Sequence, residues 1–582
     1  MGRLLGHAIA AQQWPHHRAF EAATRNPEEA QARVLRTLLR DNSDTVFGRE
    51  HGFATIGSAA EYAQRVPIRD YEALRPYVGR ITAGEPRVLT AEPPFMFTTT
   101  SGTTGEPKFI PVTAAWAHGM ASLMRLWTFY ALRDHPGMLD HRVLTIVGPA
   151  TEGVTAGGLP YGAMTGLTYQ RLPWLIRRRH ALPYAAALIR DHETRYFVAL
   201  RLALGRAVSS IGTPNPSTLL RLADIAARRG DEVIRAIHDG TLGVTKVEPM
   251  LGTGVTGLEI RAALMAGVRP NRQRAALLAD VAGRRDRLVL GDCWPELSLV
   301  ACWLGGSAGI QARHLEAHFG PQIARRDLGL VASEGRFTIP VEDDSAAGVL
   351  AVHANFYEFV AEEDIDDPAP RTLLCHELLA EGRRYYLIVT GANGLYRYDL
   401  NDVVEVRGFH ERAPKVAFVR KGRDMLNITG EKLHLNHVLH AVRAAERATG
   451  LGVWQFRLIP DVEAARYDLL VELPCSAEAG STLADFAAAF DRGLAAVNTE
   501  YESKRASERL ALPRLCVMRE GWSERLCREE FERGRREIQH KWSVMRPEWD
   551  ATSRAEVFQR LDGLKRCSSR ARLAGDRGDA PA

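Results

Sequence analysis

The chain has 582 residues, of which 46% are hydrophobic and 25% are charged. These fractions are ordinary for a soluble globular protein, and this length should hold two or more domains with sizeable cores. A formal net charge of +5 is small for such a length, so the composition does not indicate a nucleic-acid-binding protein.

The cysteines and the N-terminus bear on the cellular compartment. Seven cysteines are scattered along the chain without a C-x-x-C pair, which favours reduced thiols over a disulfide framework or a zinc site. The short apolar stretch from Leu4 to Ala11 contains His7 and lacks a clear cleavage site, so we expect no signal peptide. No run of about 18 apolar residues is present. We therefore expect a cytoplasmic protein without a membrane partner.

Helical patterns dominate the first part of the chain. Residues 15–90 indicate helices with short extended links, and Asn26-Pro27 is expected to open one of them. Residues 113–240 are also mostly helix-like, and the arginines at 177–179 are expected on a solvated face. The helix-like stretches of this region include 174–208 and 217–238, and Asn215-Pro216-Ser217 is expected to open the second.

Short β-like runs, separated by glycine and charged turns, follow between residues 285 and 425. They are expected at 297–303, 348–353, 356–360, 385–389, 402–406 and 415–419. The C-terminal part mixes helices and strands, which indicates a compact α+β domain. Its helices are expected at 435–449, 483–500 and 528–540, and its strands at 453–459, 467–473 and 511–518.

Together these elements predict an α/β fold in three parts. Residues 1–427 should form a large N-terminal domain, in which helices flank β-sheets beside a β-rich subdomain. Residues 428–562 should form a smaller, mobile α+β domain. Residues 563–582 are rich in Arg, Ser, Gly, Asp and Ala, which predicts a disordered tail.

The most informative segment is the turn from Thr100 to Lys108, with the sequence T-S-G-T-T-G-E-P-K. Its hydroxyls, backbone N–H groups and glycines make a donor-rich concavity for phosphate oxygens, and Lys108 adds a positive charge. The spacing differs from a Walker A loop, which needs G-x-x-x-x-G-K-[ST], and from a dinucleotide fingerprint. A Ser/Thr/Gly surface turn is the alternative interpretation.

Three later motifs could complete a nucleotide site. Ser333 and Glu334 follow a β-like run, and a carboxylate there suits Mg²⁺ held against phosphates. Asp402 precedes a valine-rich strand and could accept hydrogen bonds from both hydroxyls of a ribose. Lys432 follows a basic, glycine-punctuated connector that suits a hinge. Taken singly, these motifs are also typical of an ordinary turn, a capped strand start and an exposed linker.

In this order, the four motifs resemble those of the acyl-acid amido synthetases of the auxin-responsive type, a branch of the adenylate-forming superfamily. The resemblance covers nearly the whole chain, from Asp44–Arg49 and Val66–Tyr71 to Gln539–Trp542. It implies ATP and Mg²⁺ as cofactors, and a carboxylic acid and an amino acid as small-molecule substrates. It also implies that the C-terminal domain rotates over a site in the N-terminal domain, about residues near 424–430. We expect a monomer.

The resemblance assigns the phosphate and magnesium contacts. Ser333 and Glu334 match its second motif, with Glu334 as the metal ligand, and Gly306 matches a glycine that lines the adenine and acyl pocket. The residues expected to cradle the β- and γ-phosphates are Thr100, Ser101, Gly102, Thr103, Thr104, Gly105 and Lys108.

The remaining assignments concern the ribose, the α-phosphate and the C-terminal domain. Asp402 matches the ribose-binding aspartate, and Arg423 is expected to contact the nucleotide. Lys432 matches a lysine that reaches the α-phosphate, and Lys541 is expected to contribute from the C-terminal domain. Lys108, Lys432 and Lys541 are the expected catalytic residues.

Two positions depart from the family pattern. Leu330 stands where many members have a tyrosine that stacks on adenine, and Asn401 stands where the third motif usually has glycine. Leucine can still pack on the purine face, and asparagine tolerates a positive φ better than most residues. Because neither change removes a charged group, they bear on nucleotide affinity more than on the ability to bind.

The predicted reaction has two steps. The carboxylate of an acid attacks the α-phosphorus of ATP and releases pyrophosphate, and a nucleophile then displaces AMP from the acyl-adenylate. In the resembled family this nucleophile is the amine of an amino acid, so the product is an amide. The alternatives are a thioester ligase that uses coenzyme A or a carrier thiol, and a nucleotide-binding regulatory pseudo-enzyme.

Overall fold

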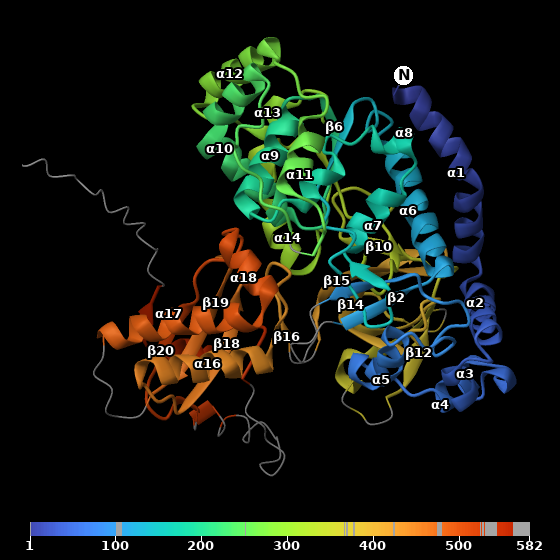
Figure 1. The fold of residues 1–582 in the computed structure, drawn as a ribbon. Helices are drawn as coiled ribbons and strands as arrows, with labels where there is room; N and C mark the ends of the chain where they lie inside the picture. Colours follow the sequence, from blue (N-terminus) through green and yellow to red (C-terminus); the bar gives the residue numbers. More distant parts are fainter. Residues whose placement is uncertain are drawn as a thin grey trace, which may run out of the picture. The chain divides into compact units, whose positions relative to one another are not determined.

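A computed structural model gives the arrangement of the chain in two compact units. Unit 1 comprises Met1–Asn436 and Asn498–Arg509, and unit 2 comprises His437–Val497 and Leu510–Ala582. Figure 1 colours them along the sequence, with unit 2 mainly in orange and red. The structure describes residues 2–100, 108–250, 252–365, 367, 370–375, 377, 379–422, 425–473, 480–523, 525, 526, 529 and 544–562.

Unit 1 begins with helices, as the sequence predicts. Gln31 of the second helix is 1% exposed. Its side chain donates a hydrogen bond to the backbone O of Val352 (2.6 Å) and accepts one from the backbone N of Tyr357 (2.8 Å), so it connects this helix to a sheet. Asn26 precedes that helix but makes no side-chain cap hydrogen bond. The helices are α1 (Gly2–Arg25), α2 (Pro27–Asp41), α3 (Val46–Glu50), η1 (Phe53–Thr55), α4 (Ala59–Arg65) and α5 (Tyr71–Thr82).

A four-stranded parallel sheet forms the α/β layer of unit 1. Its strands run in the order β3 (Arg142–Thr145), β6 (Val208–Gly212), β7 (Leu299–Ala301) and β8 (Ala324–Arg326). Leu299 and Ala301 of β7 pack with α6 (Ala114–Asp134), whereas Val300 points into a cluster with α9 and α10. Figure 1 shows α9 and α10 on one side of β6 and α6 on the other. Helices therefore cover both faces, as parallel sheets require.

The single helix expected at 174–208 is wrong. The chain instead forms α8 (Trp174–Arg177), the 3₁₀ helix η2 (Tyr184–Leu188) and α9 (His192–Leu204), and β6 starts at Val208. Pro183 precedes η2, and the side chain of Asp191 accepts a hydrogen bond from the N of Thr194 (2.7 Å), which starts a new helix. The next helix, α10 (Pro216–Asp239), agrees with its prediction, and the side chain of Asn215 caps its start by accepting a hydrogen bond from the N of Ser217.

The predicted β-rich region is confirmed as a seven-stranded antiparallel sheet in the order β12-β11-β13-β14-β15-β10-β9. The hairpin of β14 and β15 places Asp402 directly opposite Lys421. The strands are β9 (Thr338–Ile339), β10 (Ala347–Leu350), β11 (Phe356–Ala361), β12 (Thr372–Leu374), β13 (Arg384–Thr390), β14 (Tyr398–His410) and β15 (Ala413–Lys421).

Smaller elements complete unit 1. A second four-stranded sheet has the order β2-β1-β5-β4, and β16 pairs with β17. Their strands are β1 (Met96–Thr100), β2 (Lys108–Val112), β4 (Gly153–Val154), β5 (Pro160–Gly162), β16 (Met425–Leu426) and β17 (Leu433–His434). The other helices are α7 (Met164–Arg171), α11 (Gly257–Met265), α12 (Arg272–Arg285), α13 (Leu290–Cys293), α14 (Gly306–Arg313), α15 (Glu316–Phe319), η3 (Glu362–Asp364) and α18 (Thr499–Ala506).

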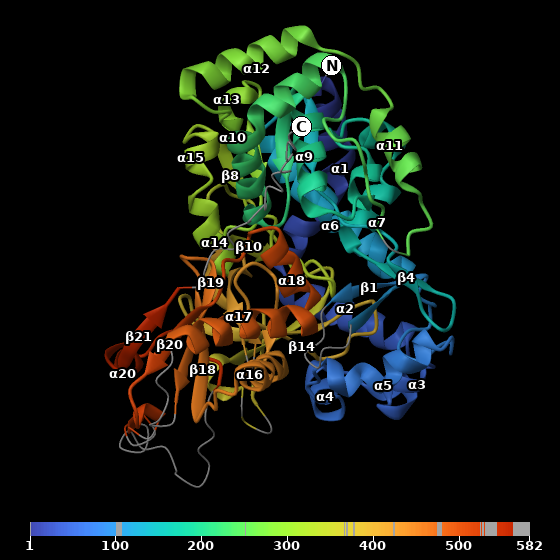
Figure 2. The ribbon, with the colours of Figure 1, turned by 60° about the vertical axis from the view of Figure 1, so that its left-hand side comes forward.

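Unit 2 is built on a four-stranded sheet in the order β18-β19-β20-β21, and Figure 2 shows two helices on the same side of it. The helix expected to run to residue 500 ends at Val497, because Asn498 accepts a hydrogen bond from the N of Tyr501 (2.8 Å) and caps α18. The elements are α16 (Leu435–Thr449), α17 (Gly480–Val497), α20 (Ala551–Ala555), β18 (Gln455–Asp461), β19 (Arg466–Glu472), β20 (Arg514–Met518) and β21 (Val557–Leu561).

Some expectations are not tested. Most of the helix expected at 528–540 and all of the tail at 563–582 lie outside the described residues. The domain boundary expected at 427/428 stays a prediction. Among the residues that can be described, no helix is long and apolar enough to cross a membrane.

A buried ion pair stabilises the seven-stranded sheet. Arg397 and Glu358 are 6% and 3% exposed and lie 2.8 Å apart, and Arg397 also donates to the backbone O of Val66 at 2.7 Å. We expect Glu358→Gln to lower the free energy of unfolding by about 3 kcal/mol, because Arg397 would stay buried without an opposing charge. Urea unfolding measures this loss. Glu363→Gln, in the exposed pair with Arg383, is the control, and an equal loss in both variants would contradict the prediction.

Candidate active site

Five charged side chains from separate segments of unit 1 gather in one cluster. They are Lys108 at the start of β2, Glu334 in the turn between β8 and β9, Asp402 on β14, Lys421 on β15 and Lys432 before β17. Electrostatic interactions link them: Glu334, Lys432 and Lys421 each shift the pKa of Lys108, and Lys421, Glu334 and Lys432 each shift that of Asp402. We call these five residues the charge cluster.

Asp402 and Lys421 form the buried centre of the charge cluster. Asp402 is 2% exposed, and the Lys421 ammonium contacts its Oδ1 while also donating to the backbone O of Leu400 at 3.3 Å. Burial raises the pKa of Asp402, and Lys421 offsets only part of that effect. Burial alone would lower the pKa of Lys421, but Asp402 and Glu334 outweigh it and hold the pKa above its ordinary value. The lysine is therefore charged at neutral pH.

Lys108 contributes a cation that forms no ion pair with a carboxylate of the described residues. Its Nζ lies 5.3 Å from the ring centroid of Tyr71, whose hydroxyl accepts a hydrogen bond from the N of Phe109 at 2.7 Å. Burial lowers the pKa of Lys108, with Lys432 and Lys421 adding to the effect, while Glu334 opposes it. Within the described ranges no carboxylate forms an ion pair with Lys108, so its charge is available to an anionic ligand.

The turn that carries Ser333 and Glu334 is held by its backbone. The Trp116 indole N–H (2.9 Å) and the Asn393 amide (3.1 Å) both donate to the backbone O of Glu334, and the Thr98 hydroxyl donates to that of Ser333 (3.4 Å). Among described groups, no hydrogen bond or ion pair occupies the Glu334 carboxylate. Its oxygens are therefore free to take a hard cation, which fits the magnesium ligand that the sequence predicts.

Lys432 lies on a tightly bonded turn. Glu431 is fully buried, and its carboxylate accepts hydrogen bonds from the backbone N of Ile428 and Thr429, both at 2.7 Å. The Asn498 amide donates to the backbone O of Lys432 at 3.1 Å, and Lys432 itself has a φ of 44°. These bonds fix the backbone while leaving the ammonium of Lys432 without a bonded partner among the described residues.

The backbone at Asn401 has the positive φ that we expect at this position of the third motif. Asn401 has a φ of 55°, the conformation for which glycine is usual and asparagine is tolerated. Its carbonyl accepts a hydrogen bond from Gly422 (2.7 Å), and a Cβ on Gly422 would lie 2.2 Å from the Tyr386 ring. Only glycine therefore fits beside Asn401. Leu330 is half-buried against the core of unit 1.

The loop after β7 brings Gly306 close to β15. Gly306 has a φ of 56°, and a Cβ there would approach the Phe418 ring to 2.7 Å. Asp327, which follows β8 and is 4% exposed, fixes this loop by accepting hydrogen bonds from the N of Leu304 (2.6 Å) and of Gly329 (2.5 Å). The loop expected to line the adenine pocket is thus hydrogen-bonded to a buried carboxylate.

The structure does not describe every predicted site residue. Thr100 ends β1 and pairs with Lys108, so the ends of the phosphate loop lie side by side, but the side chain of Thr100 is outside the described part. Ser101, Gly102, Thr103, Thr104, Gly105, Arg423 and Lys541 are also outside the described residues. Their roles stay predictions.

Sequence reasoning missed Lys421, Trp116 and Asn393. Lys421 lies within the fourth motif, but its importance depends on the β14–β15 register that puts it opposite Asp402. Aligning the β-like runs at 402–406 and 415–419 as a hairpin could have identified Lys421 as the residue opposite Asp402. Trp116 and Asn393 donate hydrogen bonds to the backbone O of Glu334. Local sequence patterns do not predict contacts of this kind.

The fold and the charge cluster define an α/β protein with a site suited to a phosphate-bearing ligand. Comparison with known families agrees. The GH3 family N-terminal domain matches residues 16–322, the central domain matches 348–421, and the C-terminal domain matches 436–546. The chain therefore belongs to the GH3 family, which confirms the resemblance to acyl-acid amido synthetases inferred from its motifs.

Similar proteins are found among plants. An indole-3-acetic acid-amido synthetase, GH3.2 of Arabidopsis thaliana, is 24% identical over 448 residues, which are 74% of this chain and 80% of that protein. A jasmonoyl–L-amino acid synthetase, JAR4 of Nicotiana attenuata, is 22% identical and covers 74% of this chain and 75% of its own length. The solved structure of the acyl acid amido synthetase AtGH3.15 with 2,4-DB has a TM-score of 0.62 at 20% identity, covering 96% of this chain and 98% of its own.

The titration of Asp327 gives a test of the Gly306 loop. Burial raises its pKa to about 7, against about 3.9 in an unfolded chain. The native state then binds the proton more tightly, so this contribution to stability is complete below about pH 4 and is lost as the pH rises toward 7. We expect Asp327→Asn, which cannot titrate, to be less stable than the wild type at pH 5, with the gap narrowing by pH 8.

Urea unfolding midpoints at several pH values measure this gap. Asp344→Asn, which removes an exposed carboxylate paired with Arg325, is the control for the loss of one negative charge. A constant gap for Asp327→Asn would contradict the assigned pKa.

Proposed function

We propose that the protein is an ATP-dependent ligase that adenylates a carboxylic acid and transfers the acyl group to an amine. The observation that carries the proposal is the gathering of Lys108, Glu334, Asp402 and Lys432, from four motifs far apart in sequence, in one charge cluster. Two lysines there have no bonded anion among described residues, and a triphosphate would supply the missing negative charge.

In the first step, a carboxylate oxygen of the acid attacks the α-phosphorus of ATP. The bond to the bridging oxygen breaks, pyrophosphate leaves, and an acyl-adenylate remains. Lys108 stabilises charge on the β- and γ-phosphates, and Lys432 stabilises charge at the α-phosphate. Asp402 accepts the ribose hydroxyls, with Lys421 holding its carboxylate in place. The Gly306 loop lines the adenine and acyl pocket.

Mg²⁺ fits this site because the Glu334 carboxylate is half-buried and unoccupied by any described hydrogen bond. When bound, the ion would neutralise charge on the phosphates. The Trp116 and Asn393 bonds to the backbone O of Glu334 fix the segment of backbone that carries this carboxylate.

In the second step, the amine of an amino acid attacks the acyl carbonyl, and AMP leaves as the amide forms. The similar plant proteins are named for this chemistry with indole-3-acetic acid or jasmonate, so an amino acid is the acceptor that we propose. We also propose a cytoplasmic monomer. Four cysteines, Cys293, Cys302, Cys375 and Cys516, are buried free thiols, which supports a reducing compartment.

Removal of either Lys108 or Glu334 should abolish adenylation. We expect Lys108→Ala and Glu334→Ala to lower acid-dependent pyrophosphate release by about 100-fold or more, because each removes a charge that acts on the phosphates. Lys246→Ala, which truncates an 82% exposed lysine, is the matched control and should keep full activity. Wild-type rates in either site variant would refute its assigned role.

The acceptor is tested separately from the adenylation. The protein is incubated with ATP, Mg²⁺ and an acid that it adenylates, together with either pooled amino acids or coenzyme A. We expect mass spectrometry to detect an acyl-amino acid in the reaction with amino acids. A thioester as the sole product would overturn the amide assignment while keeping the adenylation step. ATP binding without pyrophosphate release across a broad acid library would instead favour a regulatory protein.

A further inference from the structure

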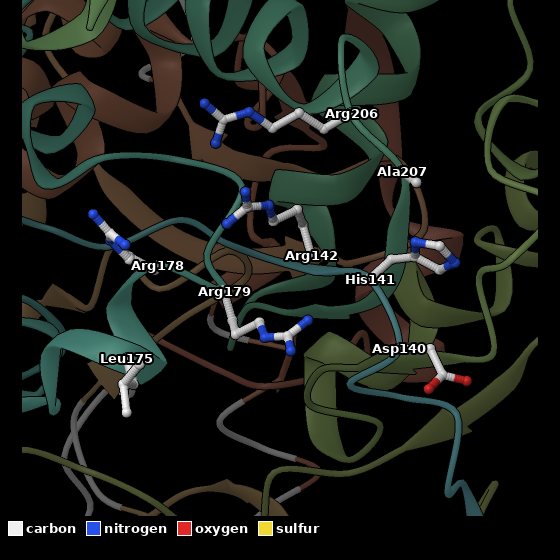
Figure 3. Close-up of a pocket in the computed structure, with 8 residues that line it drawn as sticks. All are labelled: Asp140, His141, Arg142, Leu175, Arg178, Arg179, Arg206 and Ala207. Atoms are coloured by element: carbon white, nitrogen blue, oxygen red, sulfur yellow. The ribbon is translucent and has the colours of Figure 1, made fainter. Parts of the chain in front are cut away.

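Four arginines surround a hollow in unit 1 that the proposed reaction does not use. The hollow has a volume of about 410 Å³, and Arg142, Arg178, Arg179 and Arg206 line it. Figure 3 shows Arg142 between Arg206 and Arg179, with Arg178 beside them. The arginine run at 177–179, expected on a solvated face, therefore contributes two residues to a concave site. We call it the arginine hollow.

The backbone that carries these arginines is a hydrogen-bonded framework. Arg142 begins β3, and its N donates to the O of Ala207 (3.1 Å), while the N of Val143 donates to the O of Arg179 (2.9 Å). The Arg206 guanidinium donates to the O of Ala181 at 2.9 Å. Three segments are thus bonded to one another, so the positions of the arginines are built into the fold.

The positive charge of the arginine hollow is not balanced by described carboxylates. None of the four arginines forms an ion pair with another described residue. Burial lowers the pKa of Arg206, and repulsion from the positive charge of Arg142 lowers it further. Asp140 is the acidic residue of the lining, and Figure 3 shows its side chain extending away from Arg142 and Arg206. An anion in the hollow would relieve this repulsion.

The arginine hollow is distinct from the charge cluster. Arg142 is the first residue of β3, and Arg206 lies just before β6, so both mark the amino ends of parallel strands. The loops with Gly306 and Asp327 leave the carboxyl ends of β7 and β8. In open parallel sheets, ligands bind at the carboxyl ends of the strands. The arginine hollow lies at the amino ends, which is the opposite side of this sheet from the loops with Gly306 and Asp327.

We propose that the arginine hollow binds a small molecule that carries two or more phosphate groups. A guanidinium group binds a phosphate through two parallel hydrogen bonds. Four guanidinium charges line the hollow, and one phosphate group, with a charge of about −2 at most, would balance only part of them. The rim adds an apolar surface: Trp174 and Leu175 are 55% and 62% exposed, and the Arg178 guanidinium lies 4.8 Å from the Trp174 ring centroid. The ligand is thus an inorganic polyphosphate or a nucleoside polyphosphate.

Residue-by-residue arginine labelling tests the site directly. The full-length protein is treated with phenylglyoxal, with and without tripolyphosphate, ATP or single-stranded RNA, and labelling is measured by mass spectrometry of peptides. We expect about a tenfold slower reaction at Arg142, Arg178 and Arg179 with tripolyphosphate or ATP. Arg177, which is exposed and does not line the hollow, should not be protected. Ligand bound in the charge cluster does not affect this readout.

The two phosphate probes distinguish the source of the ligand. If tripolyphosphate and ATP protect the arginines equally, the ligand is an inorganic polyphosphate. If ATP protects them more strongly, the ligand is a nucleotide that also contacts Trp174. Arg142→Gln with Arg179→Gln should weaken binding of the protecting probe about tenfold, whereas Arg177→Gln should not. Neither replaced side chain makes a hydrogen bond with another described residue. Protection by RNA alone, or equal slowing at Arg177, would overturn the proposal.

Discussion

The buried pair of Asp402 and Lys421 is the interaction on which the candidate site depends. Two opposite charges lie across one antiparallel hairpin, and each compensates the cost of burying the other. Burial raises the pKa of Asp402, and the ammonium of Lys421 offsets part of that effect. We propose that this carboxylate binds a ribose, because its two oxygens can accept hydrogen bonds from both ribose hydroxyls.

Around this neutral pair, the site retains an excess of positive charge. Lys108 starts β2 and Lys432 lies on a turn, and described hydrogen bonds hold the backbone at or next to both residues. The Glu334 carboxylate opposes them but makes no described hydrogen bond. Such an arrangement is costly in the empty protein and is relieved by a polyanion with a divalent cation, which is the electrostatic preorganisation that phosphate chemistry requires.

Local patterns predict the elements well where one signal dominates. The amphipathic helix at 435–449 and the helix that starts at Pro216 lie where the sequence places them. The region 174–208 reads as one helix because its composition is helical throughout, but Pro183 and the cap at Asp191 divide it. Short buried strands such as β3 and β6 were missed, since an apolar run of four or five residues also fits a helix.

Local sequence patterns also predict only part of the candidate active site. The motifs predict Lys108, Glu334, Asp402 and Lys432 as site residues, and the structure brings these four residues into one cluster. Lys421 depends on strand register, and the arginine hollow depends on three segments that meet only in the folded chain. Contacts of this kind arise from tertiary packing, which local sequence patterns do not encode.

The central claim is that the charge cluster activates a carboxylic acid as an adenylate. The most direct measurement is the exchange of labelled pyrophosphate into ATP, with a library of carboxylic acids and no amine or thiol acceptor. The account predicts exchange that requires both an acid and Mg²⁺, because adenylation is reversible and precedes the transfer step. Exchange that occurs only when an acceptor is present, or none with any acid while ATP still binds, would contradict it.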